Sequence, residues 1–255
     1  MKISIITVCY NSEETIKDTI ESVLSQDYPD IEHIIIDGQS TDKTMQTISE
    51  YKDKISKIIS EPDHGIYDAM NKGIKLATGD IVGILNSDDF FDDTKVISDV
   101  VSCFNSKPEA HLIFGDVVFV DPLNTRKITR YYSSKKFRPW KLRFGWMPPH
   151  PATFIKKSAY DKVGQYSLQY RISSDYEFFI RILMVHKLSS TRINKVLVRM
   201  RAGGVSTSGI KSSFLLNNEI VKGCRENGVY TNSIFLLLKV PFKILELIKR
   251  PKGVS

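Results

Sequence analysis

The sequence predicts an α/β fold built on a mainly parallel sheet with helices on both faces, and three observations support this. Short β-type runs alternate with helix-period runs over the first ~100 residues. A repeated strand–helix–strand order favours parallel strands, because each helix returns the chain to the same end of the sheet. With 255 residues, 42% of them hydrophobic and 25% charged, the chain is long and apolar enough to bury a large core.

The elements of the first half follow from local patterns. Ile3–Cys9 is rich in β-branched residues, which predicts a buried strand. Asn11 is a candidate N-cap with Glu14 three residues later, so we expect a helix from there to Gln26. Similar patterns predict strands at 31–37, 57–60 and 80–85, and helices from a cap at 40–42 to 51 and from 66 to 77.

The second half is more mixed. Residues 111–121 and 191–201 have the composition of strands, whereas 174–186 and 212–226 have helical periodicity. Between them, 135–149 is expected to form an aromatic, basic and proline-containing loop. Its two tryptophans, Trp140 and Trp146, are candidates either for stacking on a ligand or for burial in the core.

The chain is basic, with a formal charge of +7 and a pI near 9.1. This balance indicates either a solubilising surface or an anionic partner such as a diphosphate, a nucleic acid or an acidic membrane. The three cysteines form no C-x-x-C pair, which argues against a zinc site or a disulfide framework. Neither a signal peptide nor a membrane-spanning run is predicted, so the expected location is the cytoplasm.

Polar residues that follow the predicted strands form the candidate site, because ligands of parallel α/β sheets bind beyond the carboxyl ends of the strands. The strongest cluster is Asn86-Ser87-Asp88-Asp89, where a buried strand delivers two adjacent carboxylates. Mg²⁺ and Mn²⁺ take oxygen ligands, commonly carboxylates together with substrate phosphates. The alternative is that Asp88 or Asp89 caps the next turn.

Two other predicted strands also end in polar residues. Tyr10 can stack on a base, and Asn11 is either a helix cap or a ligand contact. Asp37 can accept a hydrogen bond from a nucleobase imide or a ribose hydroxyl. A further polar stretch, 61–73, runs into the predicted helix that starts at 66.

Four segments, 7–11, 37–42, 69–73 and 86–89, resemble family 2 glycosyltransferases of the GT-A fold in their order and spacing. Residues 60–91 are most similar to the branch that makes bacterial colanic acid and exopolysaccharides. In the second half, 150–154 and 172–178 are similar to the acceptor-side pattern of that branch. The resemblance implies a Rossmann-like GT-A domain over 1–205, with a nucleotide-sugar-binding half (1–105), an acceptor-side half (106–205) and a helical extension (206–255).

The resemblance also implies an activity: inverting, metal-dependent transfer of a hexose or N-acetylhexosamine from a nucleotide-diphosphate sugar, with UDP as the first expectation. The acceptor would be a glycan or a polyprenyl-diphosphate-linked sugar of a bacterial surface polysaccharide such as O-antigen, and not a nucleic acid. Asp88 matches the family's ligand for Mn²⁺ or Mg²⁺, and Asp175 matches its catalytic base. The implied nucleotide-sugar contacts are Thr7, Val8, Tyr10, Asp37, Asp68, Asn71, Asn86, Ser87 and Asp88, and the implied acceptor contacts are His150, Glu177 and Trp146.

The sequence departs from the family pattern at three positions. Gly38 and Met70 stand where many members have a second carboxylate and an arginine, so fewer residues identify the base. Asn86 replaces the first acid of the usual D-x-D, which leaves Asp88 as the principal metal ligand.

Two other function classes share parts of the pattern. A nucleotidyltransferase acting on sugar phosphates should have a glycine-rich, basic triphosphate loop after the first strand, where this chain has 10–14 with two glutamates. A non-catalytic nucleotide-sugar-binding module would leave Asp88 and Asp175 together without an explanation.

The C-terminal stretch 234–250 is apolar but interrupted by charges. Lys239, Lys243 and Arg250 recur at spacings of four and seven, which places them on one helical face opposite leucine and phenylalanine. This pattern predicts either a helix in the interface of the inner membrane, on its cytoplasmic face, or a terminal helix packed on the core or on a second subunit.

Overall fold

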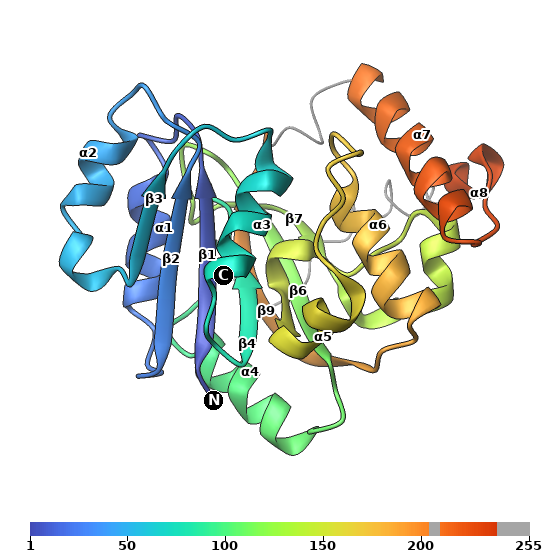
Figure 1. Cartoon of the computed structure of the whole chain (residues 1–255), viewed down its shortest axis with the longest axis horizontal. Coiled ribbons are helices and arrows are strands. Elements are labelled where there is room, and N and C mark those ends of the chain that lie inside the picture. The colour runs from blue at the N-terminus through green and yellow to red at the C-terminus, as the bar shows by residue number, and fades with distance from the viewer. Residues whose placement is uncertain (204–209, 239–255) are drawn as a thin grey trace.

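A computed structural model describes residues 1–203 and 210–238 of the chain (Figure 1). Its sheet has nine strands in the order β3-β2-β1-β4-β8-β6-β9-β5, with β7 paired to β6. The first four strands pair in parallel, as the sequence predicts. They are β1 (Ile3–Cys9), β2 (Ile31–Asp37), β3 (Lys57–Ser60) and β4 (Ile81–Ile84).

The second half makes the sheet mixed. Its strands are β5 (Asp89–Phe91), β6 (Leu112–Val120), β7 (Ile128–Tyr132), β8 (Thr153–Lys156) and β9 (Ser190–Arg201). Strand β8 runs antiparallel to both β4 and β6, and β5 and β7 are antiparallel to their partners, whereas β6 and β9 are parallel. Strands β5, β7 and β8 have only three to five residues each, too few to show a period in the sequence.

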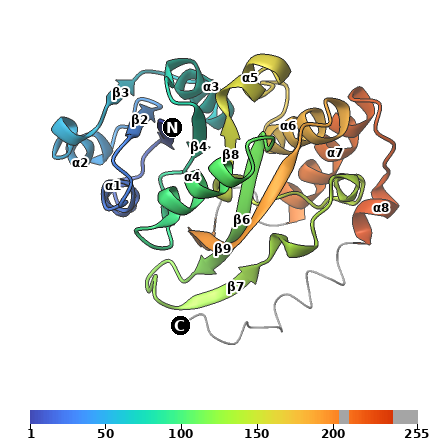
Figure 2. The same cartoon turned by 90° about the horizontal axis from the view of Figure 1, so that it is seen from below.

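Helices cover both faces of the sheet (Figures 1 and 2). On one face, buried residues of α1 and α2 pack against β1 and β2, and α4 packs against β6 and β9. On the other face, α3, α5, α6 and α7 share one apolar cluster with β1, β2 and β4. The helices are α1 (Ile16–Leu24), α2 (Thr44–Ser49), α3 (Ile66–Leu76), α4 (Val96–Ser106), α5 (Lys157–Val163), α6 (Ser174–Ile180), α7 (Ile210–Glu226) and α8 (Ser233–Leu237).

Two helix starts differ from the prediction. Helix α1 begins at Ile16, and Asn11 is not its cap: Asn11 has a left-handed φ of 48°, and its Oδ1 accepts a hydrogen bond from the Thr41 amide at 2.9 Å. Helix α2 begins at Thr44, although Asp42 does accept a hydrogen bond from the Thr44 amide, at 3.0 Å. Polar side chains of each loop also accept hydrogen bonds from main-chain amides of the other loop, as Asn11 does from Thr41 and Asp42 does from Glu13.

The second half contains shorter turns as well. The expected loop at 135–149 includes two 3-10 turns, η2 (Ser134–Lys136) and η3 (Pro139–Phe144), and a third, η4 (His150–Ala152), follows it. The predicted helix at 174–186 is α6 continued by a π-helical turn, Arg181–Val185.

The C-terminal helices pack on the main fold. Helix α7 buries Ile220 and Cys224 in the same apolar cluster as α3 and α6. Lys239, Lys243 and Arg250 lie outside the described residues. No helix within 1–203 and 210–238 has the length and apolar character needed to cross a membrane.

Candidate active site

The loops that follow β1, β2 and β4 are joined by hydrogen bonds at one edge of the sheet. The Asn11 amide donates to Ser40 Oγ at 2.8 Å, and the Ser12 and Ser87 hydroxyls are 2.8 Å apart. The Ser12 amide donates to Thr44 Oγ1 at 2.7 Å. The separately predicted strand-end segments therefore form one cluster, as expected for the carboxyl ends of neighbouring parallel strands.

The two carboxylates of the strand-end tetrapeptide have different environments. Asp89 is 1% exposed, begins β5, and accepts a hydrogen bond from Asn86 Nδ2 at 3.1 Å. Burial and the neighbouring Asp88 raise the pKa of Asp89 well above its usual range. Asp88 is less buried; burial also raises its pKa, while the charge of Arg201 opposes this. Asp89 is therefore part of the buried interior, whereas Asp88 is the carboxylate that is available to a ligand.

The oxygen atoms around Asp88 suit a divalent cation. Asn86 Oδ1 is buried and has no hydrogen-bond partner among the described residues. No side chain in 1–203 or 210–238 donates to the Asp88 carboxylate, and Arg201 binds only its main-chain oxygen, at 2.8 Å. The same residues contain no group of three His, Cys, Asp or Glu side chains that would hold a metal alone. The arrangement fits an ion whose coordination is completed by substrate oxygens.

The predicted nucleotide-sugar residues after β1 and β2 differ in accessibility. The Tyr10 ring is 62% exposed at the end of β1. Asp37 is fully buried and accepts hydrogen bonds from the Ser40 amide at 3.0 Å and the Ser60 hydroxyl at 2.6 Å. A nucleobase would have to replace one of these donors to reach the Asp37 carboxylate.

Four other residues predicted to contact the nucleotide sugar are engaged within the protein. The Thr7 and Val8 side chains are buried, and the Thr7 hydroxyl is 3.0 Å from His33 Nε2, so neither side chain is open to a ligand. The Ser87 hydroxyl bonds Ser12. Both ends of the Asn71 amide bond the main chain of Tyr166, at 2.8 and 3.0 Å. Ligand contacts by these side chains therefore stay predictions.

Asp68, in the first turn of α3, is bonded within its own segment. It accepts a hydrogen bond from the His64 amide at 3.1 Å, and Lys72 Nζ lies 3.7 Å from its carboxylate. Although burial acts to raise the pKa of Asp68, the bonds from His64 and the charge of Lys72 lower it overall. Asp68 is therefore a charged residue at the start of α3, and its contact with a nucleotide sugar stays a prediction.

Asp175 lies in the first turn of α6. Figure 1 shows the start of this helix at the same edge of the molecule as the carboxyl ends of β1 and β2. Oδ1 of Asp175 accepts hydrogen bonds from the Tyr67 hydroxyl and the Tyr176 amide, both at 2.9 Å. Its Oδ2 accepts none from the part of the chain that the structure describes. Tyr67, in the first turn of α3, was not predicted as a site residue; burial and the Asp175 charge raise its pKa, so its hydroxyl stays a donor.

The two acceptor-side residues before α6 lie in different surroundings. His150 is 8% exposed, and its Nε2 is 2.8 Å from the Tyr166 hydroxyl. Burial lowers the pKa of His150, with the Asp175 charge opposing the shift, so the ring is neutral at pH 7. Trp146 is half-buried, with Lys141 Nζ 5.7 Å from its ring centroid.

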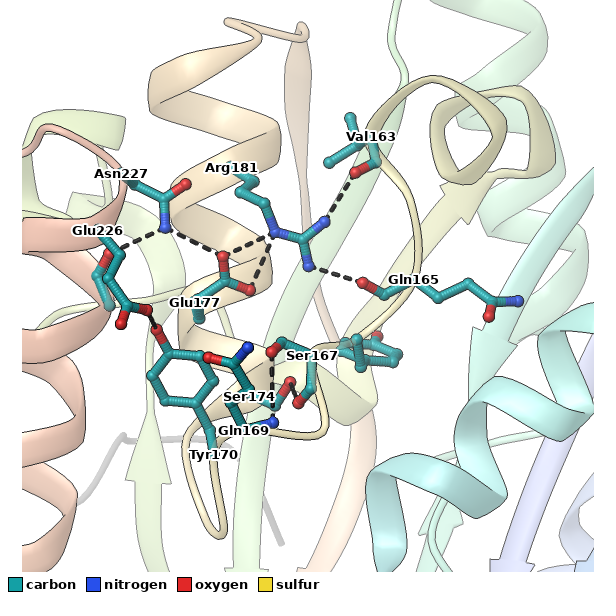
Figure 3. Close-up of polar contacts among 12 residues, drawn as sticks. Val163, Gln165, Ser167, Gln169, Tyr170, Ser174, Glu177, Arg181, Glu226 and Asn227 are labelled. Atoms are coloured by element: carbon teal, nitrogen blue, oxygen red, sulfur yellow. Dashed lines mark hydrogen bonds and ion pairs between the residues drawn. The ribbon is translucent and has the colours of Figure 1, made fainter.

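Glu177 holds helices together in a buried polar network (Figure 3). It is 5% exposed, and its carboxylate accepts hydrogen bonds from Arg181 Nε at 2.7 Å and Asn227 Nδ2 at 3.0 Å. Arg181 also donates to the main-chain oxygens of Val163 and Gln165, both at 2.7 Å. The side chain fastens α6 to Asn227, which follows α7, and through Arg181 to the loop after α5. Its contact with an acceptor stays a prediction, and such a contact would have to replace a bond of this network.

Comparison with known proteins identifies the family. Residues 4–164 match the model of glycosyl transferase family 2. An uncharacterized glycosyltransferase of Mycobacterium tuberculosis is 34% identical over 185 residues, which are 72% of this chain and 69% of that protein. An Escherichia coli protein named UDP-Glc:alpha-D-GlcNAc-diphosphoundecaprenol beta-1,3-glucosyltransferase, WfaP, is 30% identical over 229 residues, covering 85% of this chain and 84% of that one.

Solved structures with the same fold share little sequence with this chain. S. aureus TarS in complex with UDP-GlcNAc superposes with a TM-score of 0.67 at 16% identity, covering 96% of this chain and 78% of that one. Against another TarS chain, this protein spans 65% of the length. A Pyrobaculum calidifontis mannosyltransferase in complex with GDP-Man and Mn²⁺ gives a TM-score of 0.59 at 15% identity, over 99% of this chain and 81% of that one.

These solved structures establish the fold as GT-A-like, in agreement with the mixed nine-stranded sheet. The branch that makes colanic acid and exopolysaccharides is not confirmed, since the names of the relatives given above mention neither product. The family match, which covers more than half of the sequence, and the named relatives agree that the chain belongs to glycosyl transferase family 2 and is a glycosyltransferase.

Proposed function

We propose that this chain transfers a hexose or N-acetylhexosamine from a UDP-sugar to a lipid-linked or glycan acceptor of a bacterial surface polysaccharide, with inversion at the anomeric carbon. The observation that carries the proposal is a pair of carboxylates, Asp88 after β4 and Asp175 at the start of α6. Each has an oxygen that accepts no side-chain hydrogen bond within residues 1–203 and 210–238. The name of the relative WfaP, which specifies a UDP-sugar donor and a diphosphoundecaprenol acceptor, supports the choice of substrates. So does the UDP-GlcNAc bound by TarS.

Asp175 is the proposed general base. An inverting transfer needs one carboxylate to take the proton of the acceptor hydroxyl as that oxygen attacks the anomeric carbon. Oδ2 of Asp175 is available for this, while Oδ1 is fixed by Tyr67 and by the amide of Tyr176. Tyr67 therefore positions the base, because it anchors one oxygen and leaves the other for the acceptor.

Asp88 and Asn86 are the proposed ligands of a divalent cation, Mn²⁺ or Mg²⁺. When bound, the ion would neutralise charge on the departing nucleoside diphosphate. The buried, unpartnered Asn86 Oδ1 supports this, because a buried acceptor without a donor costs about 1–3 kcal/mol unless a ligand satisfies it. The Mn²⁺ complex of the Pyrobaculum mannosyltransferase is consistent with the same choice.

Family membership favours glycosyl transfer over the nucleotidyltransferase and binding-module alternatives, and one experiment tests this. The full-length protein is incubated with a panel of UDP- and GDP-sugars and Mn²⁺, and release of nucleoside diphosphate is measured. We expect UDP release from at least one donor and no pyrophosphate. Pyrophosphate formed from a nucleoside triphosphate and a sugar phosphate would instead establish a nucleotidyltransferase.

The metal role has its own test in the same assay. Asp88→Asn should abolish the Mn²⁺-dependent release while the circular dichroism spectrum stays unchanged. Asp89→Asn is not a suitable control, since Asp89 is buried in β5, so Asp93→Asn, at an exposed turn after β5, serves instead. Full activity of the Asp88 variant would remove the metal assignment.

A further inference from the structure

Helix α8 and its C-cap residue Leu238 expose large aliphatic side chains. Ile234 is 70% exposed, Leu237 59% and Leu238 53%, whereas Leu236 is buried. A cluster of large aliphatic side chains in solvent marks a contact surface when it is contiguous and rimmed by polar residues.

The loop containing η2 and η3 extends this apolar surface. Phe144 of η3 stacks on Phe235 of α8 with ring centroids 4.8 Å apart, and Trp140, 56% exposed, packs edge-on against Phe144 at 5.8 Å. Arg143 Nε donates to the main-chain oxygen of Tyr230 at 2.8 Å, just before α8. Both views of the molecule show this segment beside α8 (Figures 1 and 2). The loop and α8 therefore form one continuous surface.

The charged side chains in the two segments that form this surface are all positive. Residues 133–149 contain five basic and no acidic side chains, and residues 227–238 carry no charge. Burial lowers the pKa of Lys141, and the charges of Lys136 and Arg138 lower it further, which shows how closely the cations are gathered. The basic residues are Lys135, Lys136, Arg138, Lys141 and Arg143.

The chain continues from α8 with the same chemistry. Residues 239–255 contain five lysines and arginines and a single acid, Glu246, among apolar residues. The surface formed by α8 and the η3 loop is therefore followed directly, in the sequence, by a segment that is also basic and apolar.

We propose that the η2–η3 loop and α8 form a docking surface for an anionic lipid bilayer. Aliphatic and tryptophan side chains enter the interface, while the lysines and arginines beside them attract anionic headgroups. A second copy of this chain is disfavoured as the occupant, because two such surfaces would bring ten positive charges together, twice the five counted above. A nucleic acid is also disfavoured as the occupant, because Ile234, Leu237 and Leu238 cannot stack on its bases.

The surface is attached directly to the helix that carries the proposed base. The hydroxyl of Tyr176, next to Asp175, donates a hydrogen bond to the main-chain oxygen of Leu142 in η3. A bilayer bound by η3 would thus hold α6 close to a lipid-linked acceptor. This consequence rests on the proposed function, whereas the docking surface itself rests on the exposed side chains and their charges.

The test is co-sedimentation of the full-length protein with lipid vesicles, made of phosphatidylcholine alone or of phosphatidylcholine and phosphatidylglycerol in a 3:1 ratio. Two triple variants reverse the charges (Lys135→Glu, Lys136→Glu, Arg138→Glu) or replace the apolar residues (Ile234→Ser, Leu237→Ser, Leu238→Ser). A charge-matched control, Lys43→Glu, Lys52→Glu, Lys54→Glu, lies near α2 at the other end of the sheet (Figure 1). An apolar control, Leu123→Ser with Val185→Ser, changes exposed residues elsewhere.

We expect the wild type to bind the anionic vesicles at least ten-fold more tightly than the neutral ones. Each surface variant should lose at least ten-fold of that affinity, whereas each control should stay within three-fold. Equal binding by the surface variants and their controls would overturn the proposal. So would a wild type that binds neither vesicle, or a dimer that dissociates in the α8 variant without any vesicle binding.

Enzyme assays separate this proposal from the proposed function. The surface variants should keep nucleoside diphosphate release with a water-soluble acceptor and lose transfer to a polyprenyl-diphosphate sugar embedded in vesicles. Vesicle binding is measured without any donor, so an inactive wild type that binds anionic vesicles would contradict only the proposed function. An active enzyme whose surface variants bind as the wild type does would contradict only the docking surface.

Discussion

The two halves of the proposed site are held together in different ways. After β1, β2 and β4, the loops are fixed by hydrogen bonds of short polar side chains, such as the Asn11 side chain with the Thr41 amide and Ser12 with Ser87. Around α6, the fixing contacts are a buried ion pair between Glu177 and Arg181 and a bond between Tyr67 and Asp175, which is 108 residues away in sequence. The first region is assembled by the sheet itself, and the second by contacts between helices.

This difference predicts what each region tolerates. Pairing of the strands already brings the strand ends of a parallel sheet together. The loss of one loop hydrogen bond should therefore lower the stability of the fold only a little. The helix contacts around α6 depend on a few buried groups, and loss of one of these should be costly. The predictions below follow this contrast from the largest expected effect to the smallest.

Replacement of the base should have the largest effect. Asp175→Asn removes a proton acceptor while keeping the size of the side chain, so the rate of transfer should fall by roughly 10²–10⁴-fold. Affinity for the UDP-sugar, measured by calorimetry with Mn²⁺ present, should change by less than about three-fold, because the base contacts the acceptor. Asp161→Asn, at an exposed site on α5, is the control. Unchanged transfer by the Asp175 variant would refute its assignment as the base.

Disruption of the buried ion pair tests how α6 is held. Glu177→Ala leaves Arg181 and Asn227 without their carboxylate, and breaking a buried pair from one side costs about 3–5 kcal/mol. Urea unfolding should show this loss of stability. Lys17→Ala, which breaks an exposed pair with Glu21 at 3.9 Å, should change the free energy of unfolding by less than about 1 kcal/mol. Similar losses in both variants would mean that the Glu177–Arg181 pair contributes no more to stability than an exposed ion pair does.

The donor-side cluster could be predicted from the sequence because each of its segments is contiguous. Asn86, Asp88 and Tyr10 directly follow β-type runs, and the position of a strand end in a parallel sheet locates its loop. Helix α4 escaped prediction although its buried residues Val96, Val100 and Phe104 recur at intervals of four, which is a helical signal.

The contacts around α6 could not be predicted in the same way. The role of Tyr67 depends on a partner 108 residues away, and the partners of Glu177 depend on how α7 packs. No local pattern encodes either pairing. The assignment of Asp175 relied on resemblance to the family, and the structure adds the reason for its geometry.

A buried carboxylate on the sheet gives a pH-dependent contrast. Glu32 is 4% exposed; burial acts to raise its pKa, but hydrogen bonds from Ser4, Thr78 and Lys2 lower it from 4.5 to about 2. Because the folded pKa lies below the unfolded one, Glu32 stabilises the fold above pH 4.5, and this contribution is lost as the pH falls toward 2. The lowered pKa corresponds to a contribution of about 3 kcal/mol at pH 7.

Urea unfolding of the Glu32→Gln variant and of the wild type measures how much the Glu32 charge contributes to the free energy of unfolding. The variant should be about 3 kcal/mol less stable at pH 7, and the difference should shrink as the pH is lowered from 5 to 3. Asp30→Asn, whose carboxylate is exposed, should show no such convergence. A difference that is independent of pH would mean that the Glu32 effect comes from packing and not from its charge.

The smallest expected effect concerns the loop after β1, where the backbone conformation of Asn11 can be separated from its hydrogen bond. Asn11 has a φ of 48°, a region that asparagine tolerates and alanine disfavours, and its Oδ1 accepts a bond from Thr41. Asn11→Gly loses only the bond, whereas Asn11→Ala loses the bond and adds strain. We therefore expect the alanine variant to be about 1 kcal/mol less stable than the glycine variant in thermal unfolding. If alanine is as stable as glycine, the left-handed turn does not persist in solution, and the strand-end loops are held by less than the hydrogen bonds between them indicate.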